Sequence, residues 1–213
     1  MALKRKHVAD AKANVNSATS TGGKSKVQRS STDAEVNSAL IRNARDGDEE
    51  AMRLLLAKGA NVDATDEPGF SVLTIAAILG KEEVVRMLLE KGAAVDATDE
   101  DGWTALMMAA ICGEEEVMHL LLEKGAAVDA TDKDGWTALI RAASSGNEGA
   151  VRLLLENGAA LDMTDNRDRT ALMSAGSNGN KEVVRMLQKA EAALEVTRLR
   201  EAEVSRRSDT DAA

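Results

Sequence analysis

Residues 96–132 read DATDEDGWTALMMAAICGEEEVMHLLLEKGAAVDATD, and this stretch decides the fold because the chain repeats it. Its opening aspartate recurs every 33 residues, at Asp63, Asp96, Asp129 and Asp162. A fixed period of this length is typical of repeat proteins, in which each unit packs on its neighbours. The period defines three full units between two partial capping units: 37–62, 63–95, 96–128, 129–161 and 162–190.

Each unit predicts two short helices. In the unit that starts at Asp96 they span 104–112 and 115–124 and stop at glycines, because glycine readily adopts the left-handed backbone that ends a helix. Ordering 33 residues costs roughly 1–2 kcal/mol per residue in backbone entropy, and the few large apolar side chains of one unit return less than this. The units must therefore stack, and the alanine pairs 76–77, 109–110 and 142–143 allow their helices to approach closely.

The segments GWTALMMAA at 102–110, GEEEVMHLLLEKGAAVDATD at 113–132 and GWTALIRAA at 135–143 resemble ankyrin repeats. The resemblance covers residues 37–190 and implies an all-α solenoid of helix–turn–helix units with hairpin-like turns. It also implies a non-enzymatic protein that binds other proteins. The family's Thr-Pro-Leu-His helix start is altered here, since Ala105 and Met107 stand where Pro and His are expected in one unit. We therefore expect moderate stability.

Three regions follow one another along the chain. We expect a disordered basic tail at 1–36, the repeat domain at 37–190, and at 191–213 an extension of the last helix that frays after about Val204. Residues 1–32 carry seven Lys or Arg against one acid, whereas the whole chain has a net charge of −9. The repeat domain is therefore acidic, which argues against binding to nucleic acid or anionic lipid.

The cysteine content and the lack of long apolar runs indicate in which cellular compartment we expect the protein. With Cys112 as the single cysteine no intrachain disulfide can form, and no apolar run is long enough for a membrane span or a secretory signal. We expect a monomer in the cytoplasm or nucleus, with no cofactor and no metal. Three roles of the tail stay open. The basic run 4–6 is compatible with nuclear import, the low acid content is compatible with organelle targeting, and the tail could also have no targeting role.

Motifs that could carry chemistry have simpler interpretations. Residues 18–25, ATSTGGKS, match a relaxed phosphate-binding loop, but no apolar strand precedes them and no apolar helix follows them, so nucleotide binding stays only an alternative. Aspartate pairs such as Asp96 and Asp99 lack the spacing of a calcium loop and are expected to cap turns. Two histidines, His7 and His119, and one cysteine offer little for an active site.

The turns and the exposed side of the first helices are where the family resemblance places a partner. In this chain these positions are apolar in the N-terminal half and become polar and partly basic toward the C-terminus. We expect a peptide or protein, with an apolar helix as a suitable ligand, to contact Phe70, Ile75, Ile78, Leu79, Trp103, Met108, Ile111, Cys112, Trp136 and Arg141. Two alternatives stay open: these side chains only cover turns and help stacking, or the amphipathic C-terminal helix makes the protein self-associate.

Overall fold

The computed structural model describes residues 30–66 and 69–211, and the side chains of residues 33–66 and 69–203. The elements in this part of the chain are helices, and one isolated bridge joins Thr65 to Ser71. The helices are α2 (Ser30–Asp46), α3 (Glu49–Ala57), α4 (Val72–Ile78), α5 (Glu82–Glu90), α6 (Ala105–Cys112), α7 (Glu115–Glu123), α8 (Ala138–Ser145), α9 (Glu148–Glu156), α10 (Ala171–Ser177) and α11 (Lys181–Asp211). The predicted all-α class is confirmed.

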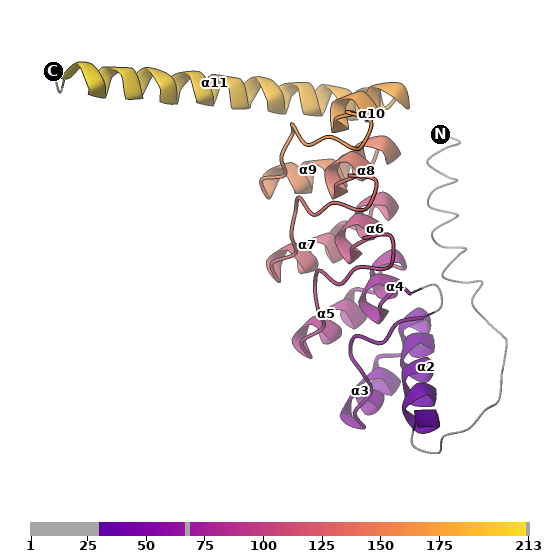
Figure 1. The fold of residues 1–213 in the computed structure, drawn as a ribbon. Coiled ribbons are helices and arrows are strands. Elements are labelled where there is room, and N and C mark those ends of the chain that lie inside the picture. Colours follow the sequence, from indigo (N-terminus) through magenta and orange to yellow (C-terminus); the bar gives the residue numbers. More distant parts are fainter. Residues whose placement is uncertain (1–29, 67–68, 212–213) are drawn as a thin grey trace.

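The helices form a single stack of helix pairs (Figure 1). The first helices of the units, α4, α6, α8 and α10, make one column, and the second helices, α5, α7 and α9, make the other. Each helix contacts its partner within the unit and the equivalent helices of the adjacent units. The predicted solenoid is confirmed.

Local sequence signals set where the first helices begin and end. The hydroxyl groups of Ser71, Thr104, Thr137 and Thr170 accept hydrogen bonds from the backbone N–H three residues later, which caps α4, α6, α8 and α10. Gly113 and Gly146 end α6 and α8 with φ values of 76° and 70°. The hydroxyl caps keep a defined helix start although the family's proline is missing.

Alanines form the closest contacts of the stack. The pairs 76–77, 109–110 and 142–143 are fully buried where α4, α6 and α8 meet. Leucine, valine and methionine side chains of the second helices, such as Leu88, Leu121 and Leu154, complete a core that runs through the stack. A side chain larger than alanine at these buried positions is expected to overpack the core.

Aspartates join one turn to the next. Oδ1 of Asp63, Asp96 and Asp129 accepts the backbone N–H of Ala94, Ala127 and Ala160, each in the following unit, at 2.9–3.0 Å. The second aspartate of each pair acts within its own turn: Oδ1 of Asp99 accepts the N–H groups of Asp101 and Trp103 at 2.9 Å. The predicted capping role is confirmed for the second aspartate of each pair, whereas Asp63, Asp96 and Asp129 join adjacent units instead.

Both ends of the stack differ from the expected boundaries. Helix α2 begins at Ser30 and so crosses the boundary expected between residues 36 and 37. Helix α11 continues to Asp211, past Val204, and its C-terminal part extends away from the stack (Figure 1). No helix in the described ranges is long and apolar enough to cross a membrane. The basic run 4–6, His7 and the 18–25 motif lie outside the described residues.

Candidate partner-binding site

Two tryptophans and two arginines stack along the turns that precede α6, α8 and α10 and on α8 itself. Each tryptophan lies directly before the hydroxyl cap of a first helix, Trp103 before α6 and Trp136 before α8. The guanidinium carbon of Arg141, on α8, lies 3.9 Å from the ring centroid of Trp103 and 4.3 Å from that of Trp136. Arg169 lies on the other side, 5.2 Å from the Trp136 centroid. We call these four residues the Trp–Arg stack.

Buried aspartates hold both arginines in place. Arg141 donates to Oδ2 of Asp132, and Arg169 donates through Nε and Nη2 to Oδ2 of Asp165, at 2.8 and 2.5 Å. Oδ1 of each aspartate accepts backbone N–H groups of its own turn. The guanidinium groups are therefore fixed against a rigid turn, with the tryptophan rings stacked on them.

The charges of the stack respond to burial in opposite ways. Burial lowers the pKa of Arg141, and its hydrogen bond and attraction to Asp132 act against this shift. Burial would raise the pKa of Asp165, but hydrogen bonds from the side chain and backbone of Arg169 and from the backbone of Arg167 outweigh it, so this pKa lies below its usual value. The carboxylate of Asp165 is therefore ionised near neutral pH.

The structure divides the predicted contact residues into two groups. Because α4 and most of α6 are enclosed by neighbouring helices, five of the residues are buried in the core: Phe70, Ile75, Ile78, Met108 and Ile111. The apolar patch that the sequence predicts on the exposed side of these helices is therefore not exposed at these positions. The other five are partly exposed: Leu79, Trp103, Cys112, Trp136 and Arg141.

The structure brings together three of the predicted residues, Trp103, Trp136 and Arg141, and adds Arg169 with the aspartates that orient both arginines. From the sequence, these aspartates are expected only to cap turns. A pairing signal was available, because Trp103 and Trp136 lie one period apart and Arg141 lies on the helix after the second of them.

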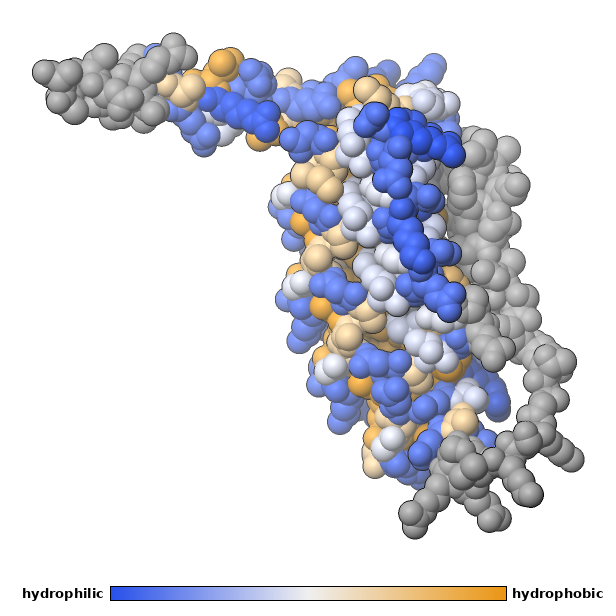
Figure 2. Space-filling model, viewed as in Figure 1, coloured by the Kyte–Doolittle hydropathy of each residue, from blue (hydrophilic) through white to orange (hydrophobic). Residues whose placement is uncertain are grey.

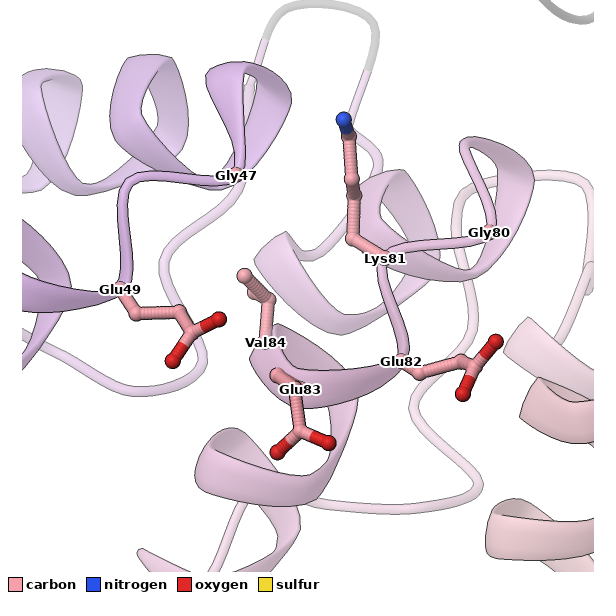
Figure 3. A pocket seen from close by; sticks show the side chains of 7 residues that line it. All are labelled: Gly47, Glu49, Gly80, Lys81, Glu82, Glu83 and Val84. Carbon is pink, nitrogen blue, oxygen red and sulfur yellow. The ribbon is translucent and has the colours of Figure 1, made fainter.

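A second candidate is a hollow between the first two described units (Figure 3). It is lined by Gly47, Glu49, Gly80, Lys81, Glu82, Glu83 and Val84 and has a volume of about 280 Å³. In Figure 3 the carboxylate of Glu49 extends toward Val84, whereas those of Glu82 and Glu83 extend away from it. Lys81 extends over Gly47, at the C-terminal end of α2, where a positive charge favours the helix. This hollow is therefore better explained by helix capping than by ligand binding.

Within the described residues, no cluster of three or more His, Cys, Asp or Glu side chains is suited to hold a metal ion. His119 is exposed on α7, and Cys112 is partly buried at the end of α6. The Trp–Arg stack is thus the site with the most specific geometry in the described part of the chain.

The sequence comparisons agree with this architecture. A family model described as ankyrin repeats in three copies matches residues 40–132 and 125–198. The chain belongs to the ankyrin repeat family. Ankyrin repeats generally mediate protein–protein interactions, and the family is generally non-enzymatic. No match to this chain was found among curated proteins.

Proposed function

We propose that this ankyrin repeat protein binds a protein or peptide partner on the face formed by the first helices and the turns before them, with the Trp–Arg stack at the centre. The observation that supports this proposal is the partial exposure of Trp103, Trp136 and Arg141 in one contiguous stack. Tryptophan and arginine are enriched among the residues that dominate binding energy at protein interfaces. Leu79 and Cys112, at the C-terminal ends of α4 and α6, are also partly exposed.

Rigidity supports the same assignment. The tryptophans are fixed by the helix caps next to them, and Arg141 by both rings and by Asp132. Side chains that are already ordered lose little conformational entropy on binding, which favours affinity. The arrangement therefore suits recognition, and catalysis would need a nucleophile or acid–base pair of a different kind.

Substitution of the tryptophans tests the proposal. We expect Trp103→Ala and Trp136→Ala to reduce the amount of bound protein recovered by affinity capture from native extract. Leu54→Ala is the matched control, because Leu54 is an exposed apolar side chain on α3, outside the proposed face. The proposal fails if both tryptophan variants recover the same proteins in the same amounts as the unmodified chain while circular dichroism shows that they are folded.

Self-association through α11 is a second candidate function. Residues 191–203 of α11 carry Leu194, Val196 and Leu199, which are 41%, 47% and 58% exposed. Figure 2 shows that this part is otherwise mainly hydrophilic. Three isolated apolar side chains bury far less than the roughly 1,200–2,000 Å² of a stable interface, so we expect a monomer. A molecular mass that rises with concentration in sedimentation experiments, and returns to the monomer value in Leu199→Ser, would favour self-association instead.

A further inference from the structure

Each turn of the stack carries an aspartate at the same place, at Asp66, Asp99, Asp132 and Asp165. In all four, Oδ1 accepts a backbone N–H of its own turn. In three of them Oδ2 accepts a hydrogen bond from an arginine of this chain: from Arg45 at Asp66 (2.6 Å), from Arg141 at Asp132, and from Arg169 at Asp165 (2.5 Å). Asp99 forms no ion pair within the described residues.

The three arginines reach their aspartates from three different positions. Arg169 follows its aspartate by four residues, Arg141 follows by nine, and Arg45 precedes by 21. Around Asp99 the equivalent positions are occupied by Trp103, Met108 and Ile78. All three are apolar. None of the positions that supply an arginine to the other aspartates can therefore supply one to Asp99.

The carboxylate of Asp99 lacks the arginine that the other three have. Asp99 is partly exposed, as Asp66 is, whereas Asp132 and Asp165 are buried. Trp103 donates its backbone N–H to Oδ1 of Asp99, and a partly desolvated carboxylate is stabilised by a cation. Arginine fits this position better than lysine, because a planar guanidinium can pair with a carboxylate and stack on an aromatic side chain together. Arg141 already stacks on Trp103 in this way.

We propose that Asp99 takes its arginine from a protein partner, whose guanidinium pairs with Oδ2 beside Trp103 and Met108. This inference rests on the proposed function, since the same face must bind a partner. It adds the chemistry of that partner: an arginine in a segment that lies along the turns. The preceding Asp66 and the following Asp132 are already neutralised by arginines of this chain. Asp99 therefore sets the register of the partner along the stack.

Selection of peptides on the full-length chain tests the inference. We expect a random dodecapeptide library displayed on phage to yield binders with an arginine at a fixed position. Replacing that arginine by citrulline, which keeps the shape and loses the charge, should weaken binding by about tenfold or more. Asp99→Asn should cause a similar loss while the asparagine Oδ1 still accepts the turn N–H groups. Glu90→Gln, at an exposed acid on α5, is the matched control and should bind normally.

Met108→Arg provides a second, independent variant. It places an arginine nine residues after Asp99, in the relation that Arg141 has to Asp132. We expect it to pair with Asp99, to abolish peptide binding, and to melt at or above the temperature of the unmodified chain. If Met108→Arg loses peptide binding and keeps its fold, the loss comes from the new arginine at the Asp99 carboxylate and not from damage to the stack.

Three results would overturn the inference. Binders without a required arginine, or binders insensitive to Asp99→Asn and Met108→Arg, would remove Asp99 from recognition and leave the proposed function standing. Failure to enrich any peptide over an unrelated protein would remove both. A gain in peptide affinity on changing Lys4, Arg5 and Lys6 to Gln would identify the chain's own basic segment as the occupant, and would exclude a separate partner as its normal source.

Discussion

Replacing Arg141 by Met tests how strongly the Trp–Arg stack supports the fold. The side chain of Arg141 is 12% exposed and that of its partner Asp132 is 1% exposed. Methionine fits this position, because the equivalent residue one unit earlier is Met108. The substitution leaves the Asp132 carboxylate buried without a counter-ion, and it removes the two ring contacts at 3.9 and 4.3 Å.

The expected loss follows from these two effects. Removing one partner of a buried ion pair costs about 3–5 kcal/mol, and a partly buried cation–π contact contributes about 0.5–2 kcal/mol. The effects overlap because they involve the same guanidinium group, and Asp132 keeps its backbone hydrogen bonds from Asp134 and Trp136. We therefore expect the free energy of unfolding to fall by about 3–4 kcal/mol at neutral pH, within a total of about 5–15 kcal/mol for a domain.

Urea denaturation followed by far-UV circular dichroism measures this loss. The double variant Arg141→Met, Asp132→Asn also removes the unpaired buried charge, so it should be more stable than Arg141→Met alone by about 2 kcal/mol. A loss below about 1 kcal/mol in Arg141→Met would refute the reasoning. A double variant that is no more stable than the single one would refute it as well, because the cost would then come from packing.

Three further predictions concern the fold. Asn147 donates through Nδ2 to the carbonyl oxygens of Ala110 and Ile111 in the preceding unit. Asn147→Ala should therefore lower the free energy of unfolding, measured by chemical denaturation, by about 1–3 kcal/mol. Asn157→Ala, at an exposed position, is the control and should have little effect. Ala109→Leu should cost about 1–3 kcal/mol because Ala109 is fully buried, and the exposed Ala193→Leu is its control; equal stabilities would contradict close packing. Folding lowers the pKa of Asp165, so its contribution to the free energy of unfolding is fully present above the unfolded value of about 3.9. This contribution is lost as the pH falls through the lower folded value. The destabilisation by Asp165→Asn in thermal melts should therefore shrink below about pH 4, and a difference that stays constant with pH would contradict the ion pair.

The sequence predicted the features that every unit shares. Gly113 and Gly146 end helices because their backbone is left-handed, and a 33-residue spacing makes such glycines visible without any structure. The aspartates at 63, 96 and 129 could be assigned to turns for the same reason, although their bonds to the following unit were not predicted. Repetition acts here as an internal alignment, because a residue type kept in all units reflects the backbone that all units share.

The exposed surface was harder to predict. Ile75 and Met108 lie on the side of the first helices that the family resemblance assigns to a partner, yet both are buried. Periodicity shows which side of a helix is apolar, but α4 and α6 contact other elements on every side, so apolar character alone could not separate core from surface. The Trp–Arg stack was missed for a related reason, because contacts across units depend on rotamers that the spacing does not determine.

The differences between units therefore carry more information about function than the shared features. The position before the first-helix cap changes from Phe70 to Trp103, Trp136 and Arg169 along the stack. A shared backbone places each of these side chains one unit from the next, so a residue such as Arg141 can contact both Trp103 and Trp136. The pattern of paired aspartates is interrupted at Asp99, where the equivalents of Arg45 and Arg141 are the core residues Ile78 and Met108. An unmet charge in an otherwise repeated arrangement is what recognition of a cationic partner requires.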